Sequence, residues 1–308
     1  MKRYRQSDRT QPAFTLVEII TTVAIIAILA AILVPAFSLA MKTAMNVKQK
    51  GQFNSINIAL EAFRTDFGDY PESYNSNDAT NQYGGAQRLA EAVIGYDGFG
   101  FHPNSVFSPW GTDSIGLGGK ELYLLPNSKL TAAEKDTSLK SRKGPYLELE
   151  TANAVKVVDL YGKVYNDARD YTFILSDAFG TVKNKRTNKQ TGMPILYYKA
   201  NPTASQHNPA NYSAAAYDPL NIFDLRHNQF ILDQGKPMES TASQIHPIVA
   251  NPTLFYEATR NPNYYNAQTP QDTSFWRPYR AESFILHSAG SDGLYGTPDD
   301  VFNFEPGK

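Results

Sequence analysis

Residues 13–37 read AFTLVEIITTVAIIAILAAILVPAF, an apolar run that contains a single charged residue, Glu18. The stretch from Ile19 to Val34 is close to the roughly 20 apolar residues that a helix needs to cross a bilayer. A carboxylate in such a segment costs about 2.5 to 3.5 kcal/mol on insertion scales, and it normally has a partner. Glu18 therefore needs a counter-charge at the depth of the membrane.

The thirteen residues before Phe14 hold four basic residues and only one acid. Positive charge ahead of an apolar run keeps that end of a chain in the cytoplasm. The sequence thus predicts that most of the chain lies outside the cytoplasm.

Three interpretations of this end compete: a secretory signal peptide, a plain membrane anchor, and a short leader that is cut off just before the apolar run. The small residues between Ala36 and Ala40 are suitable for cleavage by a signal peptidase. Cleavage there would leave Glu18 unexplained, and the helical pattern continues past Ala40. A cut between Ala13 and Phe14 creates an α-amine on Phe14. If subunits are staggered by about one turn, this amine lies at the depth of a neighbour's Glu18 and supplies the missing charge.

Residues 13–18 (AFTLVE), with the basic leader and the apolar helix, resemble the type IV pilin family. Prepilins of that family carry a small residue, then Phe-Thr-Leu-(Ile/Val)-Glu, and Pro35 falls where they commonly have a helix-bending proline. The family usually has Gly before the cut, where this chain has Ala13. The resemblance implies cleavage after Ala13 by a prepilin peptidase, N-methylation of Phe14, and filament assembly through Phe14 and Glu18.

Two further stretches resemble the major pseudopilin of type II secretion. Residues 63–71 (FRTDFGDYP) are similar to its Tyr-x-x-Asp-x-Gly-x-Tyr-Pro helix exit, with Phe63 in place of tyrosine. Residues 288–293 (SAGSDG) and 296–300 (GTPDD) are similar to its C-terminal Ser-x-Gly-x-Asp-Gly loop and the Gly-x-x-Asp-Asp that follows.

That C-terminal loop binds calcium in the family, so the resemblance implies a calcium site with Asp292, Asp299 and Asp300 as ligands. Calcium takes six to eight oxygen ligands at flexible distances, which suits a glycine-rich loop that carries three acids. Backbone oxygens near Ala289, Ser291 and Val301 are further candidates. The alternative is a solvated hairpin turn, because Asp-Gly is also an ordinary turn pair.

A long helix followed by clustered strands predicts an α+β fold. Apolar residues recur at helical spacing from Phe53 to Phe67, and Gly68 and Pro71 are typical of a helix end. This pilin-like fold is a long N-terminal membrane-inserting helix packed on a small antiparallel sheet. Helical residues around 87–94 and strands at 155–160, 171–175, 195–199 and 283–287 are expected between the ends.

The predicted organisation has four parts: a prepilin leader (1–13), the transmembrane half of the helix (14–37), its amphipathic half (38–69) and an extracytoplasmic globular domain (70–308). The globular domain includes an insertion (about 201–280) and an acidic loop (288–301). The insertion is rich in Asn-Pro pairs and is expected to form loops on the outer face.

The composition argues against several functions. The chain has no cysteine, which excludes thiol catalysis, and its net charge of −1 gives no basic footprint for nucleic acid. Its five histidines form no His-Glu-x-x-His, and no Gly-x-Ser-x-Gly is present. We therefore expect a protein that is not an enzyme.

The function that the resemblance implies is a structural pseudopilin subunit of a type II protein secretion system. Such a subunit is a single-pass inner-membrane protein with a periplasmic globular domain, and it polymerises into a periplasmic filament. The implied partners are copies of itself, a prepilin peptidase, minor pseudopilins, and an inner-membrane assembly platform with its ATPase. A type IV pilus pilin or minor pilin, and a membrane-anchored extracytoplasmic binding domain, remain as alternatives.

Overall fold

The computed structural model describes residues 14–305 except for 75–82, 116–117, 125–127, 166, 214–218, 239–242 and 265–275. The predicted leader and Ala13 lie outside the described residues. Contacts within the chain define two compact units, Met1–Ala44 and Met45–Lys308.

Helix α1 runs from Leu16 to Phe67. It ends where the sequence predicts: Gly68 adopts φ +87°, which strains any residue with a side chain, and its N–H donates to the carbonyl of Arg64 at 2.8 Å. In the first unit the large apolar side chains of α1 are exposed all round the helix. This helix is long and apolar enough to cross a membrane, and it fits the membrane anchor of a pilin-like protein.

The second unit is built on an antiparallel sheet of three strands in the order β5 (Leu196–Lys199), β8 (Phe284–Ser288) and β9 (Val301–Phe302). Tyr197 pairs with Leu286, and Tyr198 pairs with Ile285. Successive side chains of a strand point to opposite faces, so these two pairs belong to different layers of the core.

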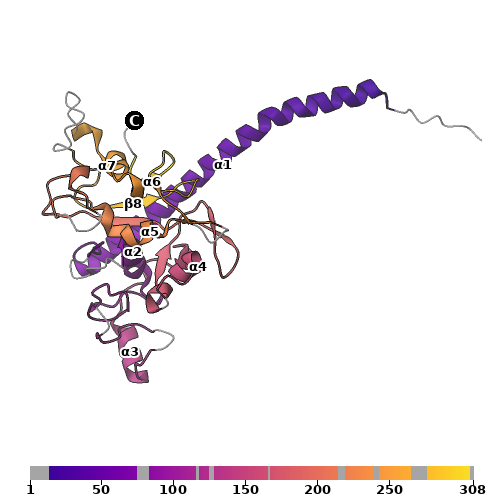
Figure 1. Ribbon diagram of the computed structural model, residues 1–308. Helices are drawn as coiled ribbons and strands as arrows, with labels where there is room; N and C mark the ends of the chain where they lie inside the picture. Colours follow the sequence, from indigo (N-terminus) through magenta and orange to yellow (C-terminus); the bar gives the residue numbers. More distant parts are fainter. Residues whose placement is uncertain are drawn as a thin grey trace, which may run out of the picture. The chain divides into compact units, whose positions relative to one another are not determined.

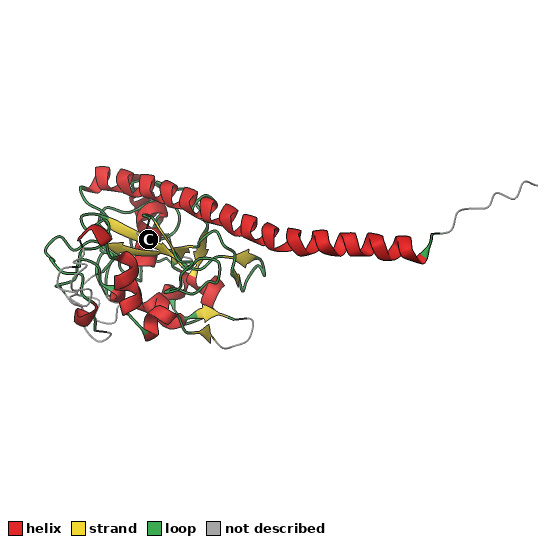
Figure 2. Cartoon of the chain, turned by 90° about the horizontal axis from the view of Figure 1, so that it is seen from above, coloured by secondary structure: helices red, strands yellow, loops and turns green. Residues whose placement is uncertain are grey.

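One face of this sheet carries the C-terminal part of α1. The predicted apolar stripe of the helix is confirmed, because Phe53, Ile56 and Leu60 are fully buried in one cluster with Tyr197 and Leu286. Figure 2 shows this part of α1 lying over the strands. The α+β fold with a long helix on a small antiparallel sheet is thus confirmed.

The other face is covered by the segment predicted as an insertion. Its loop-rich character is confirmed, and it lies on the face of the sheet opposite to α1, where part of it is buried. Phe223, Phe255 and Tyr256 are fully buried against Tyr198 and Ile285. The sheet is therefore covered on both faces.

The remaining strands form two-stranded antiparallel ladders. These are β1 (Ala154–Lys156) with β2 (Phe173–Leu175), β3 (Val182–Lys183) with β4 (Gln190–Thr191), and β6 (Lys236–Pro237) with β7 (Ser243–Gln244).

The short helices belong to the second unit, in which α3 and α7 lie at opposite ends with β8 and α5 between them (Figure 1). They are α2 (Gly85–Ile94), α3 (Ala132–Ser141), α4 (Val157–Tyr161), α5 (Gln229–Gln234), α6 (Pro247–Ala250) and α7 (Thr253–Thr259), with 3₁₀ turns at Ala168–Tyr171, Pro209–Asn211, Leu225–Asn228 and Pro262–Tyr264.

Two local predictions have different outcomes. The helix expected around 87–94 is α2, which begins at Gly85. This position requires glycine, because a Cβ there would lie 2.0 Å from the carbonyl oxygen of Tyr197. The strand expected at 155–160 is wrong beyond Lys156, where the chain turns into α4. Asp159 in this helix binds Arg186 through both carboxylate oxygens, at 2.9 and 2.8 Å, a tertiary contact that periodicity does not reveal.

Candidate functional site

The N-terminal candidate residues lie at the start of α1. The side chain of Phe14, the first described residue, is 82% exposed. The Glu18 carboxylate accepts hydrogen bonds from the backbone N–H of Thr15 at 2.9 Å and from its hydroxyl at 2.8 Å. In return, the N–H of Glu18 donates to the Thr15 hydroxyl at 3.2 Å. This reciprocal arrangement is a capping box, which satisfies donors that a helix start leaves without partners.

The capping box has a consequence for the role of Glu18. Its hydrogen-bond partners among the described residues are the neutral groups of Thr15, which solvate the carboxylate without neutralising it. The helix start thus holds a negative charge in a fixed orientation beside an exposed Phe14. The arrangement is suited to receive a cation from outside the subunit.

The C-terminal candidate residues lie in the loop between β8 and β9. One oxygen of Asp299 accepts from the N–H of Ser291 at 2.7 Å, the hydroxyl of Ser291 at 2.6 Å and the N–H of Asp292 at 3.0 Å. Gly290 allows this closure, because it has φ +66° and a Cβ there would lie 2.2 Å from the carbonyl oxygen of Asp299. The loop therefore folds around the side chain of Asp299.

Asp292 and Asp299 lie close enough to influence each other's ionisation. Partial burial raises the pKa of Asp292, and the neighbouring charge of Asp299 adds to the rise. Burial also opposes ionisation of Asp299, but hydrogen bonds from Ser291 and Thr297 outweigh it and lower the pKa of Asp299. Two like charges in contact are the arrangement that a bound cation relieves.

Asp300 does not join this pair. It points inward and accepts from Nε2 of His287 at 2.7 Å and from the N–H of Gly296 at 2.8 Å. The side chains of His287 and Asp300 are 1% and 6% exposed. Asp299 thus faces the loop, while Asp300, the residue before β9, faces the core.

Of the three expected calcium ligands, Asp292 and Asp299 lie together in the loop, whereas Asp300 is held by His287. Among the residues that the structure describes, no group of three or more histidine and carboxylate side chains is arranged to hold a metal ion. The loop therefore offers two neighbouring carboxylates instead of the three that the resemblance implies.

Sequence reasoning missed two neighbours of this loop. The ammonium of Lys236, on β6, donates to the carbonyl oxygen of Asp292 at 2.7 Å, and no local pattern predicts this contact. The hydroxyl of Ser288 donates to the buried carboxylate of Asp177 at 2.8 Å. Burial raises the pKa of Asp177 to about 7.

At the start of α1, sequence reasoning also missed Thr15 as a functional residue, although the T-x-x-E spacing before an apolar run is the sequence signature of a capping box.

The histidines are packed rather than gathered into a site. Burial lowers the pKa of His207, His227 and His246 to about 3 in each case. His207 is typical, since its Nε2 lies 2.8 Å from the hydroxyl of Thr259 inside the core. These side chains stay neutral at physiological pH.

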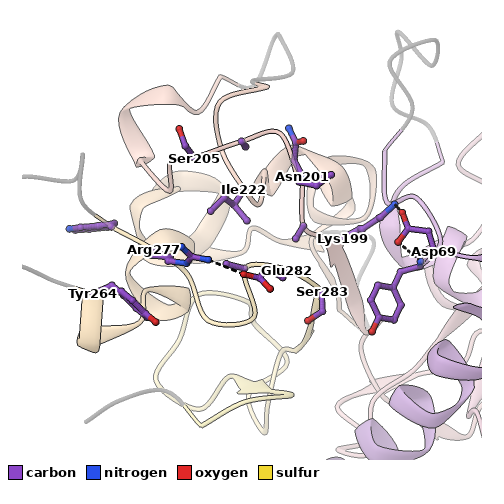
Figure 3. A pocket seen from close by; sticks show the side chains of 15 residues that line it. Asp69, Lys199, Asn201, Ser205, Ile222, Tyr264, Arg277, Glu282 and Ser283 are labelled. Carbon is purple, nitrogen blue, oxygen red and sulfur yellow. Dashed lines mark hydrogen bonds and ion pairs between the residues drawn. The ribbon is translucent and has the colours of Figure 1, made fainter.

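A cavity of about 680 Å³ opens between the end of α1 and the inserted segment (Figure 3). Both cations that line it are paired: Lys199 donates to Asp69 at 2.7 Å, and Arg277 lies 3.3 Å from Glu282. The described lining residues thus carry no uncompensated charge that would select a charged ligand.

The comparisons with known proteins bear on the N-terminal residues. Residues 8–34 match the family described as the prokaryotic N-terminal methylation motif. The comparisons with curated proteins and with solved structures gave no match. The matched segment contains Phe14, the capping box and the first half of the apolar helix. The N-terminal segment of the chain is therefore similar to that of type IV pilin-like proteins.

Proposed function

We propose that the chain is a structural, non-enzymatic pseudopilin subunit of a type II protein secretion system. The observation that carries the proposal is the methylation motif together with Glu18, whose carboxylate is oriented by Thr15 at the start of an exposed apolar helix. After cleavage before Phe14, the α-amine of one subunit would neutralise Glu18 of the next. The energetic cost of a lone carboxylate in lipid then favours assembly over the monomer.

In this proposal the protein is a single-pass protein of the inner membrane with its globular unit in the periplasm. Copies of the chain polymerise into a periplasmic filament. A prepilin peptidase processes the chain, minor pseudopilins start the filament, and an inner-membrane platform with a cytoplasmic ATPase drives its growth.

The proposal includes calcium in the C-terminal loop. The contact between the Asp292 and Asp299 carboxylates supports it, since calcium would relieve their repulsion. The ion would join the two sides of the loop between β8 and β9. Asp300 is proposed to act beside it as a structural acid held by His287.

Two measurements test the proposed function. Mass spectrometry of the mature protein should find N-methylated Phe14 at its N-terminus, and peptides reading through Ala13 as the dominant form would contradict processing. Deletion of the gene should then abolish protein secretion and leave surface fibres intact. Loss of surface fibres with normal secretion would instead assign the chain to a type IV pilus, and retention of the leader would favour a membrane-anchored binding domain.

A further inference from the structure

The turn that follows α2 exposes an aromatic ring. Phe99 lies between Gly98 and Gly100, whose φ values of +86° and +93° favour glycine. The side chain of Phe99 is 59% exposed, and that of Leu149 is 39% exposed. The two residues lie on adjoining segments, because a Cβ on Gly98 would lie 3.0 Å from Cδ1 of Leu149. The turn and its neighbour therefore present an apolar patch to solvent.

Buried groups hold this turn in place. The carboxylate of Asp97 accepts from the N–H of Phe99 at 3.2 Å and from the N–H of Leu124 at 2.7 Å. It also pairs with Arg142 at 2.6 Å, and the side chains of Asp97 and Arg142 are 5% and 1% exposed. A group that is fixed before binding loses little conformational freedom when a partner binds. Phe99 is thus suited to anchor a partner.

Acidic residues border the apolar patch. Glu148 and Glu150, on either side of Leu149, are exposed, and neither carboxylate forms an ion pair with another residue that the structure describes. We call Phe99, Glu148, Leu149 and Glu150 the Phe99 surface. An apolar centre with a polar rim is the usual anatomy of a protein–protein interface. The partner of this surface should offer basic groups.

The β3–β4 hairpin carries the opposite charge. Residues 182–191 read VKNKRTNKQT, with four basic residues and no acid. The ammonium of Lys185 donates to the carbonyl of Tyr161 at 2.8 Å, a neutral group that leaves its charge in place. Lys189 is exposed and forms no ion pair within the described part of the chain. Arg186 is already bound to a carboxylate of α4, so the argument uses only the two lysines.

The acidic and basic segments lie near each other in the subunit without touching. Glu150 and Gln190 of β4 both line a cavity of about 410 Å³. The charges of the two segments therefore remain available to another molecule.

We propose that the Phe99 surface of one copy of the chain binds the β3–β4 hairpin of a second copy. The carboxylates of Glu148 and Glu150 would pair with the lysines of the hairpin. A lysine has an apolar stem that can cover Leu149 and an ammonium that is attracted to the face of an aromatic ring. The hairpin thus complements both the charge and the apolar centre of the surface.

The two surfaces are unlike, so each bound pair of copies still has one free surface of each kind. A contact of this type can extend along a filament. The inference rests on the self-assembly in the proposed function, and it adds a contact between globular units to the one at Glu18.

The test uses disulfide trapping, which is selective because the chain has no cysteine. Full-length Thr151→Cys, beside the Phe99 surface, and Thr187→Cys, on the hairpin, are reconstituted together in vesicles of zwitterionic lipid and oxidised. Both positions are exposed. The mixed disulfide dimer should be at least about fivefold more abundant than the dimer of either variant alone, because binding raises the effective concentration of the two thiols.

Glu257→Cys, on the exposed side of α7, is the control partner for Thr187→Cys. Its mixed dimer should not exceed the dimers that each variant forms alone. Equal trapping of Thr187→Cys by Thr151→Cys and by Glu257→Cys would overturn the proposal.

Charge reversal tests the pairing itself. Glu148→Lys with Glu150→Lys in the Thr151→Cys chain should lower the mixed dimer by about fivefold, since like charges then face each other. Lys185→Glu with Lys189→Glu in the partner chain should restore it. Circular dichroism checks that each variant is folded, and failure of the folded pair to restore the mixed dimer would overturn the proposal.

Phe99→Ala tests the aromatic anchor, and it should lower the mixed dimer as well. The matched control is Ile58→Ala, because Ile58 is 72% exposed and lies on α1, outside both surfaces. An equal effect of the two substitutions would contradict a specific role for Phe99.

These results are separable from the proposed function, because trapping in vesicles requires no secretion machinery. Absence of trapping, together with lost secretion after gene deletion, would reject this contact alone. Specific trapping with normal secretion after gene deletion would support the contact and reject the role in secretion.

Discussion

Thr15 and Glu18 form reciprocal hydrogen bonds at the start of α1, and both donors of Thr15 point at the Glu18 carboxylate within 2.9 Å. One acid therefore has two separable properties, its role as a helix cap and its negative charge. A capping box accepts Gln as well as Glu at this position. Substitutions at Glu18 can thus distinguish local helix stability from assembly.

Glu18→Gln should keep the cap and abolish filament assembly, because the amide still accepts from Thr15 but carries no charge for a neighbour's α-amine. Membrane insertion should persist, since removing the charge eases insertion by about 2.5 to 3.5 kcal/mol. Membrane fractionation and filament counts by electron microscopy measure the two properties.

Thr15→Ala is the matched control, because it removes the hydroxyl of the cap and leaves the charge of Glu18. It should cost about 1 kcal/mol of helix stability and still assemble. Normal filaments in Glu18→Gln would show that the charge has no role in assembly.

Calcium binding by the full chain in detergent should raise its melting temperature. A ligand that binds only the folded state adds about 2.7 kcal/mol at a hundred times its Kd. Asp292→Asn should abolish this response while keeping an acceptor for the N–H of Leu294, which donates to Asp292 at 2.7 Å. Magnesium should act much less, because it requires near-octahedral geometry and keeps its waters.

Asp299→Ala is expected to abolish the response as well, but it also removes the acceptor around which the loop folds. The informative companion is Asp300→Asn, which weakens the pair with His287 and leaves both loop carboxylates in place. It should lower stability and preserve the calcium response. Equal melting of the wild type and Asp292→Asn, with calcium and with chelator, would reduce the loop to a hairpin turn.

Much of the fold could be predicted from the sequence because its signals are local. The spacing of Phe53, Ile56 and Leu60 already defines the buried face of α1, and Gly68 marks its end. The strand content of β5 and β8 is equally visible, since both faces of these strands are buried and their residues form nearly continuous apolar runs.

The features that the sequence did not predict depend on contacts between distant residues. Residues 157–161 have the β-branched content of a strand but form α4, where Asp159 meets Arg186. The inserted segment has loop-like composition, yet Phe255 and Tyr256 complete the core on the far face of the sheet. At the C-terminal loop, the inward direction of Asp300 and its contact with His287 could be seen only in the structure.

The unfolding free energy should fall as the pH drops below about 6.5. His207, His227 and His246 have folded pKa values of about 3, below the value of about 6.5 in an unfolded chain. The unfolded state therefore binds more protons between these values, and the stability present above pH 6.5 is lost toward pH 3. Urea unfolding at pH 7, 6 and 5 measures the loss, and a flat profile would contradict the burial of these rings.

Asp177 should have the opposite effect on the pH dependence of the unfolding free energy. Burial raises its pKa from 3.8 to about 7, so the folded state binds the extra proton between these values, and its contribution to stability falls as the pH rises to 7. Each proton changes the unfolding free energy by about 1.4 kcal/mol per pH unit. Three histidines against one carboxylate leave a net slope of about 3 kcal/mol per pH unit between pH 4 and 6.5. These four groups together place the maximum of stability near pH 6.5.

Asp177→Asn should therefore be more stable than the wild type at pH 8, by up to about 4 kcal/mol, which corresponds to three pKa units. The two proteins should be nearly equal near pH 4, because Asp177 is protonated there in the folded state and about half protonated in the unfolded state. The amide can keep both contacts, since its oxygen accepts from the N–H of Phe179 and its NH₂ donates to Ser288. Ser288→Ala is the matched variant, and it should lower stability where Asp177→Asn raises it. The change removes a hydrogen-bond donor from the ionised Asp177 carboxylate, so the loss of stability should be greatest above pH 7. Urea midpoints that shift equally for Asp177→Asn at pH 4 and pH 8 would show that Asp177 does not titrate within this range.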